Sequence, residues 1–166
     1  MPQLATPITD AIDGFHTNEY VLGKAFTAIT PEESLRQPAP DSNHALWILG
    51  HLINCRNSVM RFLGQPPASS QAWLPLFDRG AELQKDTSVY PSWNELLEIW
   101  PESTAALHKA LNEASEEVLD SPSPEGVPSV DKKMSGAVRF FVIHEAYHTG
   151  QLGYLTTWLG HEGLIG

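Results

Sequence analysis

The stretch SGAVRFFVIHEAYHTGQLGYLTTWL, residues 135–159, combines the apolar periodicity of an α-helix with two histidines. Leu152 and Leu155 belong to its apolar face, and His144 and His148 lie on or beside that face. At the helical rotation of 100° per residue, the two histidines are ~40° apart around the axis and ~6 Å apart along it. The pattern therefore predicts a helix that packs against other helices and turns two imidazoles inward.

Three further segments show helical periodicity, and no segment shows the sustained two-residue alternation of a strand. They run from about Thr6 to Ile29, from about His44 to Leu63, and from Ser92 to about Leu119. A chain of 166 residues is long enough for one domain with a full core. We therefore expect an all-α protein, with residues 1–166 forming a single four-helix bundle domain with long connections.

Residues at the helix ends and between the helices refine this expectation. The side chains of residues 41–43 are expected to cap the second helix, and Ser92 and Glu95 have the spacing of a capping box. Pro101 lies too far beyond that cap for a first-turn proline, so it is expected to kink or divide the third helix. The connection of residues 65–91 is unusually long and aromatic, which predicts a functional loop that packs onto the helices.

Composition excludes several classes of protein. The formal net charge of −10, without a cluster of Lys and Arg, argues against a nucleic-acid partner. Cys55 is the one cysteine, so no intramolecular disulfide is possible and a reducing compartment is expected. Neither a signal peptide nor an apolar run of the ~20 residues that span a membrane is recognisable. The sequence predicts a cytoplasmic protein without a membrane partner.

The letters H-E-x-x-H at residues 144–148 match the motif of zinc proteases, in which two histidines bind the metal and the glutamate activates water. The protease class also needs a third ligand further along the chain. Its extended motif requires glycine and histidine at positions where this chain has Gln151 and Tyr154. Zinc proteases also hold peptides along a sheet edge, and no strand is predicted here. The spacing of the histidines therefore serves some other purpose.

A third histidine is predicted from the second helical segment. His51 shares a face with Leu52 and Cys55, and packing of the second helix on the fourth would bring it to His144 and His148. Three neutral imidazoles would hold a divalent metal and leave coordination positions open, as in catalytic sites. The alternative is three half-buried histidines with ordinary hydrogen bonds, since a buried imidazole needs a partner of some kind. Spacing alone leaves both interpretations open.

Two motifs resemble the DinB/YfiT-like family of metalloenzymes: W-x-x-G-H at residues 47–51 and H-E-A-Y-H-T-G-Q-L at residues 144–152. The loop WLPLFDRG and the segment YPSWNELL are also similar to that family. The resemblance implies a four-helix bundle with a divalent metal bound by His51, His144 and His148. It further implies thiol-dependent S-transferase or isomerase chemistry, with a low-molecular-weight thiol such as mycothiol or bacillithiol as co-substrate.

Several side chains near the histidines have two interpretations each. Glu145 is a weak candidate for a general base or for a partner of a metal ligand, and a solvated surface glutamate is the favoured alternative. Cys55 could approach the metal, although free cysteines are often simply buried. Arg56 could bind a substrate carboxylate, although an exposed helical arginine is commoner. Gln151 and Tyr147 could orient ligands, or could pack on a neighbouring helix or subunit.

Three functions remain open from the sequence. The favoured one is a metal-dependent transferase or hydrolase acting on a small molecule. The second is a non-catalytic metal- or ligand-binding sensor, and the third is a structural bundle without metal. Zinc or nickel is the expected metal, with iron as an alternative, because imidazole ligands suit all three. A homodimer is also expected, from the glycines and tryptophans.

Overall fold

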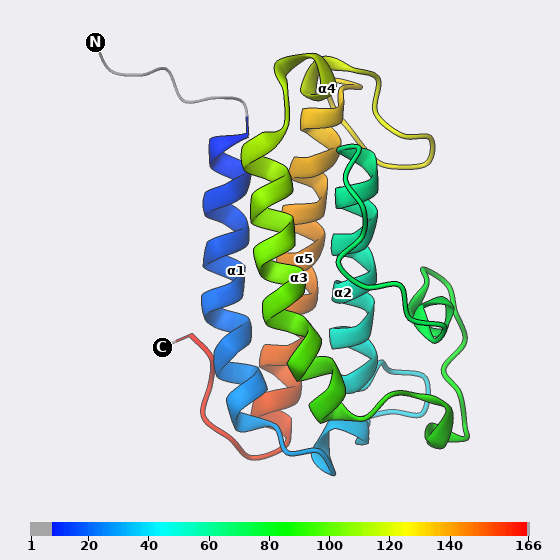
Figure 1. Ribbon diagram of the computed structural model, residues 1–166. Coiled ribbons are helices and arrows are strands. Elements are labelled where there is room, and N and C mark those ends of the chain that lie inside the picture. Colours follow the sequence, from blue (N-terminus) through cyan, green and yellow to red (C-terminus); the bar gives the residue numbers. More distant parts are fainter. Residues whose placement is uncertain (1–7, 166) are drawn as a thin grey trace.

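The computed structural model describes residues 8–165, in which the regular elements are helices and two residues form one isolated bridge, Pro122 with Lys133. Figure 1 shows the long helices lying side by side, with a short helix near one end. The helices are α1 (Thr9–Ala28), α2 (Ala45–Phe62), α3 (Trp93–Glu113), α4 (Glu116–Asp120) and α5 (Met134–Trp158), and the 3-10 turns are η1 (Glu33–Leu35), η2 (Leu74–Phe77) and η3 (Thr87–Val89). The expectation of an all-helical protein is confirmed.

The helix starts agree only in part with the sequence. The capping box of α3 is confirmed, because the Ser92 hydroxyl accepts from the Glu95 N–H and the Glu95 carboxylate accepts from the Ser92 N–H. The prediction that residues 41–43 cap α2 is wrong. His44 takes that role, with its Nδ1 accepting the Trp47 N–H at 3.0 Å. The predicted start of α1 at Thr6 lies outside the described residues.

The third helical segment also differs from its prediction. It does not continue to Leu119, because the backbone becomes extended at Ala114 and Ser115 caps the separate helix α4. Of the kink or division expected at Pro101, the division does not occur, because α3 runs through this residue. Pro101 lies on the exposed side of α3 beside the buried Trp100. The missing N–H therefore costs one backbone hydrogen bond without disturbing the buried face.

The core consists of two apolar clusters separated along the bundle. One cluster takes residues from the end of α1, the start of α2, the start of α3 and the end of α5, including Leu22, Ile48, Leu96 and Leu152. The other takes residues from the opposite ends of the same helices, including Phe15, Met60, Leu107 and Val138. The middle turns of the four helices lie between these clusters and carry buried polar side chains, among them His51, Asn54, Arg56, Ser103, Glu145 and His148. The fold thus places a polar layer inside an apolar bundle.

The long connection between α2 and α3 packs against α2, as expected. Phe77 of η2 is fully buried, and a Cβ built at Gly50 of α2 would lie 2.4 Å from its ring. Glycine is therefore required at position 50 for the loop to approach the helix this closely. The Trp47 indole N–H donates to the Leu76 carbonyl at 3.1 Å, which holds η2 beside the polar layer.

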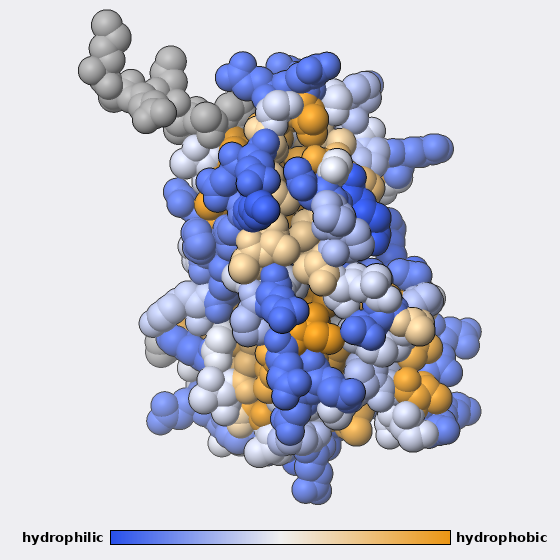
Figure 2. Space-filling view, in the orientation of Figure 1, coloured by the Kyte–Doolittle hydropathy of each residue, from blue (hydrophilic) through white to orange (hydrophobic). Residues whose placement is uncertain are grey.

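Figure 2 shows one face of the molecule as largely hydrophilic, with hydrophobic residues visible along its middle. Helix α5 also exposes Ile143, Tyr147 and Tyr154, which lie at helical spacing along its outer side. A second copy of the chain would be expected to pack on this exposed stripe, and the homodimer stays a prediction. In the described part of the chain, no helix has both the length and the apolar character required to cross a bilayer.

Candidate metal centre

Three histidines from two helices meet in the polar layer. His51 comes from α2, and His144 and His148 lie one turn apart on α5. The ring centroids are 5.2 Å apart for His51 and His144, 4.8 Å for His51 and His148, and 4.6 Å for His144 and His148. The packing of α2 on α5 therefore brings together the three residues that the sequence singled out, although 93 positions separate His51 from His144 in the chain (144 − 51).

Two of the three rings are oriented by hydrogen bonds on their far sides. His51 Nδ1 lies 2.7 Å from the Phe77 carbonyl oxygen, and His148 Nδ1 lies 2.7 Å from Gln151 Oε1. Both oxygens can only accept, so each Nδ1 carries the proton and donates it. Each Nε2 is then left with a lone pair, which faces His144 Nε2 in the case of His148 and Cys55 Sγ in the case of His51. A metal ligand oriented by a second hydrogen bond has this arrangement.

The separation of the ring nitrogens also fits one bound ion. His144 Nε2 and His148 Nε2 are 3.2 Å apart. Two nitrogens bound to one tetrahedral zinc at ~2.0–2.1 Å each would be about 3.3–3.4 Å apart. His144 Nδ1 is buried and has no hydrogen-bond partner among residues 8–165, so the surrounding protein does not satisfy this imidazole fully.

Burial keeps the three imidazoles neutral. It lowers the pKa of His51, and it lowers the pKa of His144 to about 4 and of His148 to about 3, with the neighbouring imidazoles adding to the effect for His144 and His148. Neutral imidazole is the form that binds a metal. At neutral pH, His144 and His148 would therefore bind an ion without first losing a proton.

Cys55 lies closer to the centre than the sequence suggested. Its Sγ is 3.5 Å from His51 Nε2, one helical turn away on α2. One donor atom from each of His51, Cys55 and His144 lies within 4.8 Å of the others. His148 is not a member of this set, and its contact with it is through His144 Nε2, 3.2 Å from its own Nε2. Burial raises the pKa of the Cys55 thiol to about 12, and the charges of Glu145 and Asp78 act in the same direction. In the absence of a cation, Cys55 is therefore a neutral thiol.

The glutamate of the H-E-x-x-H motif is buried, which corrects the favoured prediction of a surface position. Glu145 is 3% exposed, and its two carboxylate oxygens accept from Arg56 Nε at 2.8 Å and Arg56 Nη2 at 2.9 Å. Arg56 is 1% exposed, so the prediction of an exposed helical arginine is also wrong. Burial raises the pKa of Glu145, and the charge and hydrogen bonds of Arg56 oppose this increase. Because Arg56 occupies both oxygens, Glu145 is poorly placed to act as a general base.

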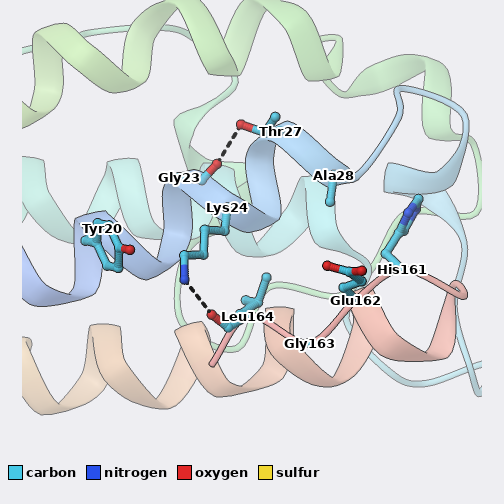
Figure 3. A pocket seen from close by; sticks show the side chains of 9 residues that line it. All are labelled: Tyr20, Gly23, Lys24, Thr27, Ala28, His161, Glu162, Gly163 and Leu164. Carbon is cyan, nitrogen blue, oxygen red and sulfur yellow. Dashed lines mark hydrogen bonds between the residues drawn. The ribbon is translucent and has the colours of Figure 1, made fainter. Parts of the chain in front are cut away.

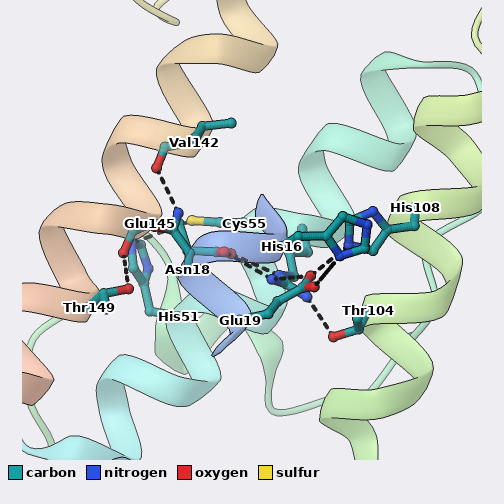
Figure 4. Close-up of polar contacts among 11 residues, drawn as sticks. His16, Asn18, Glu19, His51, Cys55, Thr104, His108, Val142, Glu145 and Thr149 are labelled. Atoms are coloured by element: carbon teal, nitrogen blue, oxygen red, sulfur yellow. Dashed lines mark hydrogen bonds and ion pairs between the residues drawn. The ribbon is translucent and has the colours of Figure 1, made fainter. Parts of the chain in front are cut away.

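The Arg56 guanidinium continues the polar layer towards α1 and α3. It donates to Glu19 Oε1 at 3.0 Å and to the Thr104 hydroxyl at 2.7 Å, and it lies over the Trp100 ring at 3.8 Å. Figure 4 shows Glu19 and Thr104 gathered with two histidines at this end of the layer. Arginine thus links all four long helices, a role that no local sequence pattern indicates.

A second group of possible metal ligands, His16, Glu19 and His108, lies at this end. His108 Nε2 is 2.9 Å from Glu19 Oε1, and the His16 and His108 rings stack at 3.9 Å. Burial by itself would raise the pKa of Glu19, but the hydrogen bond from His108 and the charge of Arg56 outweigh it and the pKa is lowered. Because Arg56 already supplies Glu19 with a cation, we assign this group to the polar layer.

A cavity of about 590 Å³ opens beside the histidine centre. His51, Cys55 and His144 form one part of its wall. The rest comes from two further polar side chains of α2, from three aromatic side chains and from the two long connections: Asn54, Ser58, Phe62, Phe140, Phe141, Asp78, Arg79 and residues 125–128. A small molecule in this cavity would reach the centre from the side of Cys55. Both long connections therefore contribute to the wall of the cavity, beside side chains of α2 and α5.

Another hollow, of about 690 Å³, lies between α1 and the C-terminal segment (Figure 3). Its one lysine, Lys24, donates to the Leu164 carbonyl at 3.1 Å, and Glu162 and His161 lie at its rim. No three of its side chains form a metal-binding group among the described residues. The histidine centre is therefore the candidate functional site.

Gln151 and Tyr147, the remaining candidates from the sequence, lie beside His148. Gln151 orients His148, as one of its two interpretations proposed, and it also donates to the Tyr147 hydroxyl at 3.3 Å. Tyr147 is 63% exposed. The Phe77 carbonyl was missed from the sequence, because a backbone acceptor in a loop has no signature in residue type.

The comparisons with known proteins bear on this centre. The family model of the DinB superfamily matches residues 15–152, which include all three histidines. Comparison with curated proteins and with solved structures produced no match.

Proposed function

This chain belongs to the DinB superfamily, and we propose that it is a DinB-type four-helix bundle that acts as a divalent-metal-dependent enzyme on small molecules. His51, His144 and His148 are the proposed metal ligands. The observation that carries this proposal is the convergence of three neutral imidazoles, of which His51 and His148 are buried and have Nδ1 engaged, and His144 is half-buried. The reaction we favour is thiol S-transfer, with hydrolysis as a related possibility.

The metal is proposed to be zinc or nickel, with iron as an alternative, because imidazole nitrogens suit each of them. A bound divalent ion lowers the pKa of a coordinated thiol or water and so supplies a nucleophile at neutral pH. The Phe77 carbonyl and Gln151 hold two of the ligands in position for that ion. Phe62, Phe140 and Phe141 surround the approach with apolar surface and limit access of water.

A second function is favoured by the position of Cys55. A sulfur ligand beside three histidines would fill the coordination sphere of a tetrahedral ion, as in structural metal sites. The protein would then be a non-catalytic metal-binding module. Turnover distinguishes the two functions, because only the enzyme should convert electrophilic substrates in the presence of a low-molecular-weight thiol.

The test is the metal content of the protein, purified without an affinity tag and measured by elemental mass spectrometry. We expect about one divalent ion per chain, and loss of most of it in His51→Ala and in His148→Ala. His161→Ala is the matched control, because His161 pairs with Glu33 outside the centre. A metal-free protein that also fails to bind added zinc and nickel would contradict the proposal, as would a His51→Ala variant with unchanged affinity.

A further inference from the structure

We propose that the thiolate of Cys55 is a fourth protein ligand, so that the metal is bound by three nitrogens and one sulfur. This inference rests on the proposed metal site and adds to it a ligand that the three-histidine pattern does not contain. On binding, the Cys55 S–H bond breaks, a sulfur–metal bond forms, and the proton leaves to solvent.

The distance between Cys55 and His51 is the first argument. A tetrahedral zinc with a Zn–N bond of ~2.0–2.1 Å and a Zn–S bond of ~2.3 Å places its nitrogen and sulfur about 3.5 Å apart. The structure has Cys55 Sγ and His51 Nε2 at 3.5 Å. The two residues are four apart on α2, so the helix itself presents both donor atoms on one side.

The second argument is the direction of the His51 lone pair. His51 is 5% exposed, and its Nδ1 donates to the Phe77 carbonyl. Its Nε2 is therefore an acceptor, and it faces Cys55 Sγ. An S–H group is a weak donor and satisfies a buried imidazole nitrogen poorly. One cation between these atoms, with His144 also in reach, would satisfy both.

Acidic side chains also lie near Cys55. Glu145 and Asp78 act on the thiol by their negative charge, and Arg56 already pairs with Glu145, so Asp78 is the carboxylate left to favour a cation here. Cys55 also shares the cavity wall with His51 and His144, so the ion would lie at the base of the cavity. A substrate entering there would add as a further ligand or displace the sulfur. A soft thiolate also favours zinc over iron in this centre.

The experiment uses cobalt(II) in the full chain, in buffer without any added thiol. A thiolate bound to cobalt(II) gives an intense charge-transfer band in the near ultraviolet, which imidazole ligands do not give. Because Cys55 is the one cysteine of the chain, such a band in the unmutated protein must come from it. The result therefore does not depend on whether a variant folds.

The variants Cys55→Ala and Cys55→Ser extend the test, and Ser58→Ala is the control, since Ser58 lines the same cavity from the same helix. We expect the band in the unmutated protein and in Ser58→Ala, and its loss in both cysteine variants. Zinc affinity should fall about 100-fold without Cys55, because one of the four ligands that contribute to the binding free energy is then missing. Cobalt binding without the band would overturn the fourth ligand and leave the three-histidine centre intact. Failure of the unmutated protein to bind cobalt or zinc would overturn both.

Discussion

At the residue scale, the chemistry of the centre depends on which nitrogen of each histidine is free. His51 and His148 are held by acceptors on their Nδ1 side, so both present Nε2 to the centre. The acceptor for His148 is Gln151, three residues further along α5, and the acceptor for His51 is a backbone carbonyl of η2. Side chains and backbone groups that do not touch the proposed metal would therefore control its affinity.

Gln151 provides a test of that control. In Gln151→Ala, the His148 ring loses its acceptor and its fixed orientation, so zinc affinity should fall about 10–100-fold. Isothermal titration calorimetry with a competing chelator measures the change. Tyr147→Phe is the control, because it removes only the hydroxyl on the other side of Gln151 and should leave affinity unchanged. Equal affinities in the two variants would show that Gln151 does not orient the ligand.

At the element scale, α2 carries His51, Cys55 and Arg56, and its position depends on both of its ends and on the loop beside it. The His44 ring caps the first turn through Nδ1, and it is 3% exposed. Its Nε2 is buried without a hydrogen-bond partner among residues 8–165. A second proton on this ring would thus remove the capping acceptor and leave a buried charge.

The cap predicts a dependence of stability on pH. Burial lowers the pKa of His44 to about 4 in the folded protein, whereas an unfolded histidine titrates near ~6.5. The unfolded chain binds the proton first, so the contribution of His44 is complete above pH ~6.5 and is lost as the pH falls towards about 4.

The free energy of unfolding, measured with denaturant, should fall between pH 7 and pH 4 by about 3 kcal/mol more in the unmutated protein than in His44→Asn. Asparagine retains a capping acceptor but does not titrate. Parallel pH profiles for the two proteins would mean that His44 is not the titrating group.

At the scale of the whole molecule, the polar layer connects all four long helices between two apolar clusters. Arg56 of α2 contacts Glu145 of α5, Glu19 of α1 and Thr104 of α3. Removing one member of a buried ion pair leaves an uncompensated charge, which costs far more than the pair contributes. The layer therefore makes the arrangement of the helices specific.

Arg56→Met should lower the free energy of unfolding by about 3–5 kcal/mol, because Glu145 would remain buried without its partner. Arg61→Met is the control on the same helix and should change stability by less than about 0.5 kcal/mol, because Arg61 is exposed. The double variant Arg56→Met, Glu145→Gln should recover part of the loss. If Arg56→Met were no more destabilising than Arg61→Met, the ionic layer would not contribute as described.

Features that depend on neighbouring residues could be predicted from the sequence alone. The helical periodicity, the capping box of α3 and the pairing of His144 with His148 on one face are all local. The motifs around His51 and His144 also indicated the DinB superfamily, which the family match over residues 15–152 confirms. The end of α3 at Glu113 was missed because capping by Ser115 competes with a continuing helix, and the residue pattern allows either.

The tertiary structure alone decided which polar groups are buried and what they contact. Glutamate and arginine suit exposed helical positions as well as buried ones. Packing of α2 on α5 nevertheless buries Glu145 and Arg56 and joins them across 89 residues. The Phe77 carbonyl approaches His51 only because η2 docks over Gly50, and Cys55 approaches His144 only because α2 packs on α5. The sequence by itself therefore determined the helices and the three histidines, because these depend on near neighbours. Only the tertiary structure decided the partners of those histidines, because long-range packing sets burial and distance.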